Sequence, residues 1–198
     1  MGYKVPRKPR ELSPLQQEVA LYSQDLLGSE AEIYTFEAVD GSRELPILIV
    51  PDCPSPGLST YSTIGYSDHP QPNYGSSLNL ELIGACDTPI TDFANVMTSC
   101  VIESLNNDRP INYGVVFWDI VSQYGISATL QHVTFVAPYF WEGFSKARLL
   151  DRDVHWLMVL PIAQSEMVYL KTHGVDALEK KLEESDLDFT DINREAAV

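Results

Sequence analysis

The stretch of sequence that decides the fold runs from Val154 to Arg194 and reads VHWLMVLPIAQSEMVYLKTHGVDALEKKLEESDLDFTDINR. Its first part, Val154 to Pro161, is apolar at nearly every position, as expected of a strand that is buried on both faces in the middle of a sheet. Two short helices are expected to follow, at Ser165 to His173 and at Asp176 to Ser185. This part of the chain therefore predicts a central strand followed by two helices, against which the other elements are expected to pack.

Six further stretches upstream have the length and the alternation of strands. They are Ala31 to Val39, Leu45 to Val50, Leu58 to Tyr66, Ser77 to Gly84, Val115 to Trp118 and His132 to Ala137. The first two are expected to form a hairpin through an Asp40-Gly41 turn, and the next two are expected to pair with each other. Strands mixed with helices, without strict alternation, predict an α+β domain with a central mixed, largely antiparallel sheet and helices packed on its faces.

Two more helices are expected, one after Ser13 and one from Thr88 to Asn106, because apolar residues recur in each at helical spacing. The signals that predict where helices begin and end come from side chains that satisfy free backbone groups and from residues suited to the turn. They are, in chain order, Ser13 with Gln16, Gly28, Thr88 with Pro89, Gly174, and Asp176 with Glu179.

The size of the chain, 198 residues with 44% hydrophobic content, predicts one domain with one core. We expect that domain to span residues 13–198. In the first twelve residues, Lys4, Arg7, Lys8 and Arg10 are interleaved with Pro6 and Pro9, a composition that predicts a basic flexible arm.

The net charge of −15 argues against binding to nucleic acid or to an anionic membrane, and it favours a basic partner. Cys53, Cys86 and Cys100 include no Cys-x-x-Cys pair, which argues against a disulfide framework and favours a reducing compartment. No stretch has the pattern of a signal peptide or the length of a membrane span. These observations together predict a cytoplasmic protein.

Signals for catalysis are sparse in this sequence. Asp151, Asp153 and His155 would share one side of a strand that began at Asp151, and two carboxylates with an imidazole could hold a divalent ion. A metal-dependent hydrolase built on these three residues is therefore the alternative function. Ser67 lies near an acid and His69, but such a turn is more simply a strand end, and no phosphate-binding loop is present. We expect no catalytic residue, no metal and no cofactor.

Two segments could contact a partner. The aromatic segment Tyr139 to Phe144 lies beyond a strand end, where its rings are either part of the core or anchors of an interface. The acidic segment Asp176 to Glu195 either guides a basic partner through its field or is a solvated helix face. Both alternatives stay open for each segment.

Two short motifs resemble the Suppressor of fused family. In the stretch quoted above, Leu160-Pro161-Ile162 is followed by Glu166 and by a terminal Asp-x-x-Arg at Asp191 to Arg194. Upstream, Tyr61 to Asp68 (YSTIGYSD) is similar to the family's Tyr-x-x-x-Gly-x-Ser-Asp strand and turn. With the order of elements between them, the resemblance covers roughly residues 13–195.

The resemblance implies a protein-binding domain without catalytic activity. Animal members of that family sequester a transcription factor through a short peptide, and many bacterial members are thought to be immunity proteins that neutralise polymorphic toxins. This chain resembles a bacterial single-domain member, so immunity is the first interpretation and a regulatory peptide-binding adaptor is an alternative. The resemblance implies partner contacts at Tyr61 and Asp68, although the loop departs from the animal pattern at His69-Pro70. Tyr139 and Trp141 are added from the aromatic segment.

Overall fold

The strand predicted at Val154 to Pro161 is β9 (Arg152–Ala163), an interior strand of the sheet next to the middle strand. It runs parallel to β5 (Ser76–Asp87) on one side. On its other side it runs antiparallel to β7 (Leu130–Val136) and then to β8 (Lys146–Leu149). Its second half is buried throughout, whereas burial alternates along the first half. Burial on both faces is therefore confirmed for the second half of the strand.

The computed structural model describes residues 6–9, 11–28, 30–37, 41, 43–69, 71–73, 76–87 and 91–198, with the backbone alone for 72, 73, 76 and 77. The other strands are β1 (Glu32–Glu37), β2 (Glu44–Pro51), β3 (Leu58–Thr63), β4 (Gln71–Asn73) and β6 (Val116–Phe117). Their order is β1-β2-β3-β5-β9-β7-β6, with β4 beside β5 and β8 beside β9. Of the strand pairs in this described part, β5 with β9 is the parallel one. The predicted α+β class with a mixed, largely antiparallel sheet is confirmed.

Both strand pairs predicted from the sequence are present. The hairpin pairs β1 with β2, and β3 pairs antiparallel with β5; Asp40 of the predicted turn lies outside the described residues. The strand predicted to reach Tyr66 is shorter, because it ends at Thr63 and Tyr66–Asp68 forms a short 3-10 helix. Gly65, between the two, has a φ of 150°, a backbone angle that residues with side chains rarely adopt.

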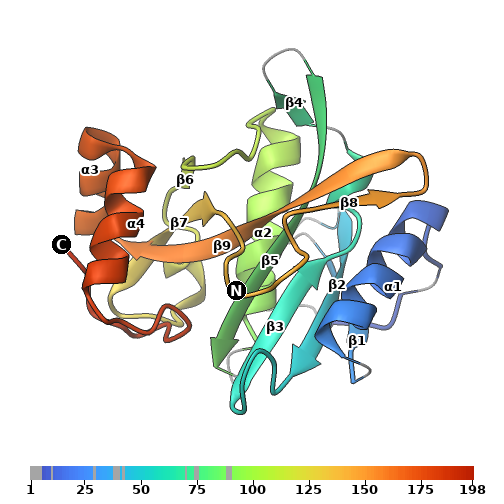
Figure 1. The fold of residues 1–198 in the computed structure, drawn as a ribbon, viewed down its shortest axis with the longest axis horizontal. Coiled ribbons are helices and arrows are strands. Elements are labelled where there is room, and N and C mark those ends of the chain that lie inside the picture. The colour runs from blue at the N-terminus through green and yellow to red at the C-terminus, as the bar shows by residue number, and fades with distance from the viewer. Residues whose placement is uncertain are drawn as a thin grey trace.

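Helices cover both faces of the sheet (Figure 1). The helix α2 (Phe93–Asn106) packs on one face. The helices α1 (Pro14–Leu27), α3 (Gln164–His173) and α4 (Val175–Glu184) pack on the other, with α3 and α4 together at one end. A second 3-10 helix is Ser122–Tyr124. No helix in the described ranges is long and apolar enough to cross a membrane.

The beginnings of the helices follow the sequence signals only in part. At α1 the capping box of Ser13 and Gln16 is present, and Gly28 ends the helix, as predicted. The predicted start at Thr88 is wrong for α2, which begins at Phe93 after a turn; residues 88–90 lie outside the described ones. The capping box predicted for α4 is also wrong, because the helix begins one residue earlier and Asp176 already lies in its first turn.

The terminal Asp-x-x-Arg motif is explained by a buried ion pair between Arg194 and Glu166. The Nη1 and Nη2 atoms of Arg194 donate to Oε1 and Oε2 of Glu166 at 2.7 and 3.0 Å. Glu166 also accepts from the backbone N–H groups of Ala163 and Ala197, and Arg194 donates to the carbonyl of Pro161. Such a bidentate pair compensates much of the cost of burying two charges. It joins the end of β9, the start of α3 and the residues after 190.

The predicted flexible arm is held at one point. Arg7 exchanges two backbone hydrogen bonds with Thr35 of β1, at 2.7 and 3.3 Å, and its guanidinium pairs with Glu44. The expected flexibility therefore does not apply to Arg7, because it lies against the outer edge of the sheet. Lys4 and Arg10 lie outside the described residues.

Candidate partner-binding surface

The segment Tyr61 to Asp68 is organised around Glu81, a fully buried carboxylate on β5. The hydroxyls of Thr63 and Ser67 donate to this carboxylate, as do the backbone N–H groups of Gly65 at 2.8 Å and Ser67 at 3.1 Å. Burial raises the pKa of Glu81, and these hydrogen bonds oppose that rise. The motif therefore has a structural role, because its polar residues satisfy a carboxylate in the core.

The two residues expected to contact a partner in this segment have different surroundings. Tyr61 is 1% exposed and packs against Phe93, so it offers a partner no surface in this conformation. Asp68 is partly exposed, and its carboxylate accepts from the Ser13 hydroxyl at 3.2 Å and the Gln16 amide at 3.1 Å. Asp68 thus holds the first turn of α1 against the turn that follows β3.

Replacing Asp68 with Ala should lower the free energy of unfolding by about 1–2 kcal/mol, because two hydrogen bonds to a half-buried carboxylate are lost. Asp68→Asn, which keeps one acceptor oxygen, should lose less. Urea denaturation of both variants, beside Ser13→Ala, measures the effect. An Asp68→Ala protein with the wild-type midpoint but weaker partner capture would instead support the contact role expected from the resemblance.

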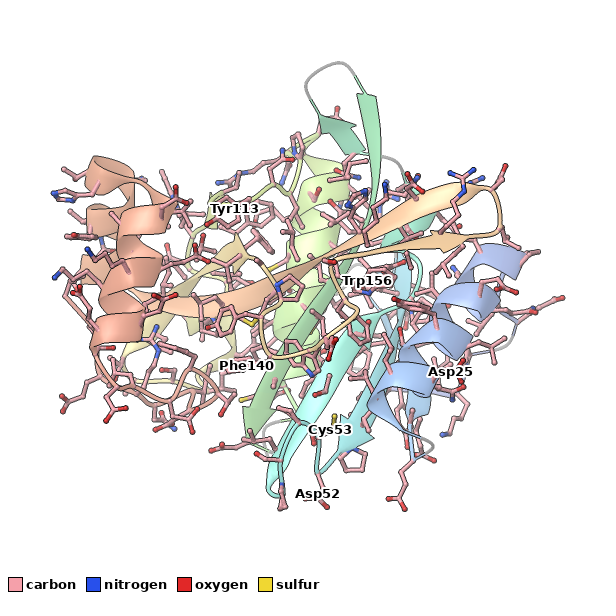
Figure 2. All side chains as sticks on the ribbon, in the orientation of Figure 1. Asp25, Asp52, Cys53, Tyr113, Phe140 and Trp156 are labelled. Carbon is pink, nitrogen blue, oxygen red and sulfur yellow. The ribbon has the colours of Figure 1, made fainter. Side chains whose placement is uncertain are left out.

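The aromatic segment divides into an inner and an outer half. Phe144 and Trp141 are buried, and the indole N–H of Trp141 donates to the Thr60 hydroxyl at 3.1 Å. Tyr139 and Phe140 are 52% and 37% exposed, and Figure 2 shows Phe140 on the segment that leaves the sheet. The inner rings of the segment, including the expected contact Trp141, therefore belong to the core. Tyr139 and Phe140 are exposed, and a partner contact through them stays a prediction.

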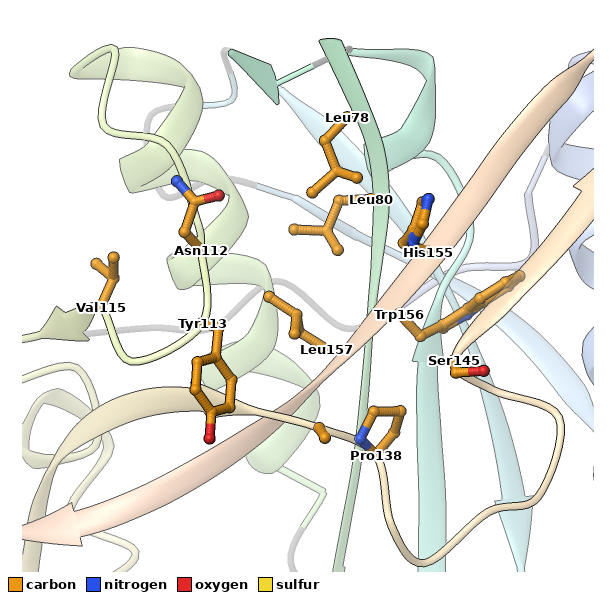
Figure 3. A pocket seen from close by; sticks show the side chains of 11 residues that line it. Leu78, Leu80, Asn112, Tyr113, Val115, Pro138, Ser145, His155, Trp156 and Leu157 are labelled. Carbon is orange, nitrogen blue, oxygen red and sulfur yellow. The ribbon is translucent and has the colours of Figure 1, made fainter. Parts of the chain in front are cut away.

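An apolar hollow of about 920 Å³ is lined in part by Ala137 and Pro138, which come directly before these two rings in the chain. Leu78 and Leu80 on β5 and Leu157 on β9 reach from the sheet toward the segment that carries Asn112 and Tyr113 (Figure 3). The remaining lining residues are Val115, Ala137, Pro138, Ser145, His155 and Trp156. Concave apolar surfaces with a polar rim are common places for a ligand or a partner to bind.

Acidic side chains of α4 lie beside this hollow. The Tyr113 hydroxyl donates to Asp176 at 2.9 Å and also to Glu179. Burial raises the pKa of Tyr113, and the two carboxylates raise it further, so the phenol stays protonated and keeps donating. In the described part of the chain, no basic side chain forms an ion pair with Asp176, Glu179 or Glu183, whereas the lysines of α4 pair with Glu184.

We name this region the aromatic-acidic face. It joins exposed rings that follow β7 and precede β6 to the carboxylates on one side of α4. Its members are Tyr113, Tyr139, Phe140, Asp176, Glu179 and Glu183. Exposed aromatic rings beside carboxylates without a cation form a surface suited to a basic protein partner.

The alternative metal site is not assembled. The Asp153 carboxylate is bound by Lys146 at 2.8 Å and Arg148 at 3.2 Å, and these contacts lower its pKa. Asp151 lies before the strand, beside Arg152, whereas His155 lines the hollow. Burial lowers the pKa of His155, and Lys146 acts in the same direction. Among the described residues, no three His, Cys, Asp or Glu side chains converge as metal ligands would.

Ser67 and two of the three cysteines lie in the core. Ser67 is 1% exposed, and its hydroxyl donates to Glu81. Cys86 and Cys100 are buried, and burial raises the pKa of both thiols, in Cys86 to about 12. A thiol with a raised pKa holds little of the reactive thiolate at neutral pH.

Comparison with known proteins identifies the family. Residues 41–195 match the family described as Suppressor of fused protein (SUFU). This chain belongs to the Suppressor of fused family. The immunity protein YqcF of Bacillus subtilis strain 168 is 32% identical to it over 175 residues, which cover 86% of this chain and 91% of YqcF. The family expected from the two motifs is confirmed.

Solved Suppressor of fused structures have the same fold. A homologue from Neisseria gonorrhoeae FA 1090 superposes with a TM-score of 0.71 at 19% identity, over 93% of this chain and 97% of that one. A Sufu-Fu complex gives a TM-score of 0.62 at 11% identity, over 96% and 93% of the two chains. Drosophila Suppressor of Fused gives 0.56 at 11% identity, and the match covers 92% of this chain but 50% of that protein.

The structure of this Suppressor of fused domain adds residues that the sequence interpretation missed. Tyr113, which links the hollow to α4, was not among the expected contacts, and neither was Leu157 on the floor. One signal was available: Leu78 and Leu80 alternate within the predicted strand, which places them on the same face. The alternation does not indicate that this face of the sheet borders a hollow beside Tyr113.

Proposed function

We propose that this chain is an immunity-type protein, a non-catalytic domain that binds a partner protein such as a polymorphic toxin and neutralises it. The relative named immunity protein YqcF supports this, because the match covers 91% of its length. The Sufu-Fu complex adds that another protein of this fold has been captured with a partner. A toxin with a basic surface is the partner that the chemistry of this chain favours.

The main structural support for the proposal is the composition of the aromatic-acidic face. Tyr139 and Phe140 are exposed in the turn after β7, and Glu179 and Glu183 line the same pocket as Tyr139, without a basic ion-pair partner in the described residues. Aromatic rings supply contact area at low entropic cost, and the carboxylates attract positive charge. The net charge of −15 adds a long-range attraction for a basic protein, which raises the rate of association at low salt.

A metal-dependent hydrolase is not supported by the geometry. Asp153 is held by two basic side chains, and His155 faces the hollow rather than Asp153 and Asp151 together. The buried Ser67 hydroxyl is committed to Glu81. These arrangements favour a domain that acts by binding.

The proposal is tested by capture followed by protection. The tagged chain is used to isolate its partner from the native host, and the partner is then expressed alone and together with the chain in a sensitive strain. We expect the partner to arrest growth, and co-expression to restore it through a stable complex. A captured partner that is harmless, or that stays toxic beside the folded chain, would overturn the immunity function.

The surface is tested in the same assay by reversing charge at two places. Glu179→Lys with Glu183→Lys should weaken the complex by at least about tenfold, because favourable charge contacts become repulsive. The matched control, Glu18→Lys with Asp25→Lys on α1, makes the same change in net charge at the other end of the sheet (Figure 2). Equal losses for the two pairs would show that total charge matters and that the aromatic-acidic face does not.

A further inference from the structure

A second, smaller pocket of about 350 Å³ lies within the aromatic-acidic face, between the end of β7 and α4. Its walls are mostly apolar, and its rim carries two carboxylates and a phenol. The lining residues are Val136, Ala137, Tyr139, Leu160, Glu179, Leu182, Glu183 and Phe189. This volume is at the small end for binding pockets, so it suits one long side chain better than a helix.

Two aromatic rings, of Tyr139 and Phe189, line this pocket. Tyr139 and Phe189 meet edge to face, with centroids 6.4 Å apart and planes at 89°. Tyr139 is 52% exposed, so part of its ring is open to a partner. An apolar wall of this kind can pack against the methylene stem of a side chain while the end of the side chain stays at the rim.

The charge around the pocket is negative. Glu183 is exposed and Glu179 partly so, and Tyr113 donates to only one oxygen of Glu179. The guanidinium of Arg194 lies over the ring of Phe189, 5.9 Å from its centroid, and acts electrostatically on Tyr139, but both of its terminal nitrogens are bound by the buried carboxylate of Glu166. Glu179 and Glu183 therefore leave a negative potential at the mouth of the pocket.

We propose that this pocket binds an arginine side chain presented by the partner protein. The guanidinium would lie at the rim, where Glu179 and Glu183 accept its N–H groups, and its stem would pack on Tyr139 and the apolar wall. Arginine fits better than lysine, because its planar group stacks on aromatic rings and donates in two directions at once. The inference rests on the proposed partner-binding function, and it names the chemistry that this function recognises.

The test uses a defined probe and the intact chain. N-acetyl-arginine amide is titrated into labelled protein, and backbone and side-chain NMR shifts are followed beside the neutral isostere N-acetyl-citrulline amide. We expect saturable shifts at Tyr139, Glu179 and Glu183 with the arginine probe and none there with citrulline. Glu179→Gln with Glu183→Gln should weaken arginine binding by about tenfold, whereas Glu18→Gln with Asp25→Asn should leave it unchanged.

Three results would overturn the inference. The first is that the citrulline probe binds as well as the arginine probe, and the second is that both pairs of substitutions weaken binding equally. The third is that no saturable shift appears at these residues up to about 20 mM arginine probe, a range that covers weak millimolar binding. The unliganded spectra show whether each variant is folded. If the glutamine pair did not fold, Tyr139→Ser would be tested in its place and should weaken binding by removing the stacking ring. Protection from a toxin without arginine binding would leave the immunity function standing and remove only this pocket.

Discussion

Replacing Arg194 with Ala is expected to lower the free energy of unfolding by about 3–5 kcal/mol, as is usual when one partner of a buried ion pair is removed. The Glu166 carboxylate is fully buried and receives both terminal nitrogens of Arg194. Without the guanidinium, a negative charge would remain in the core, where the donors left to it among the described residues are the backbone N–H groups of Ala163 and Ala197. Urea denaturation monitored by fluorescence and by circular dichroism measures the loss.

Two control variants separate the ion pair from general effects of substitution. Arg152→Ala removes an exposed arginine that lies 3.7 Å from Asp151, and it should change stability by less than about 0.5 kcal/mol. Arg194→Ala combined with Glu166→Gln should recover part of the loss, because the buried charge is gone. If the double variant were as unstable as the sum of the single variants, the two residues would not be coupled and this explanation of the motif would fail.

Replacing Trp156 with Ala should also cost about 3–5 kcal/mol, the usual range for emptying an aromatic site in a core. Trp156 is 2% exposed and lies between the sheet and α1, stacked on Tyr22 and in edge contact with Phe144, each 5.5 Å away between centroids (Figure 2). The cavity left by the indole would be bounded by two elements that cannot close it without moving. The denaturant midpoint reports the change.

Trp156→Phe is the matched control. Among the described residues, the indole N–H of Trp156 has no hydrogen-bond partner, so its removal costs no hydrogen bond within the protein. We expect Trp156→Phe to lose much less stability than Trp156→Ala. A wild-type midpoint for Trp156→Ala would show that the ring contributes nothing to the core and that its central placement is incorrect.

Most of the fold could be predicted because its signals are local. The apolar run from Val154, the alternation around Leu78 and the capping residues of α1 each depend on neighbours within a few positions. One error, at the start of α4, shows where local signals fail. Asp176 has the spacing of a helix cap, but Gly174 takes that position and Asp176 accepts from Tyr113 instead. Tertiary contacts of this kind are not visible in a helical pattern.

The roles of the motif residues could not be predicted for a different reason. Ser67 depends on Glu81 and Arg194 depends on Glu166, and in each case the partner is brought close only by the folded sheet. Short conspicuous motifs suggested function, yet both proved to surround buried carboxylates. Most of the aromatic-acidic face lies in the two segments expected from the sequence, Tyr139 to Phe144 and Asp176 to Glu195. Tyr113 was not expected, because its link to α4 is made only in the folded chain.

The position of β9 has a consequence for how the chain folds. The strands β1, β2, β3 and β5 can assemble from neighbours along the chain, and so can β7, β8 and β9. The pairing of β9 with β5, however, must form across the long segment that contains α2, β6 and β7. Pairing of distant strands is slow because a long loop has to close before the contacts form. Until then the edge of β5 is exposed to other chains, so high concentration during synthesis favours aggregation. The strand that completes the sheet thereby also sets the period in which the newly made protein is vulnerable.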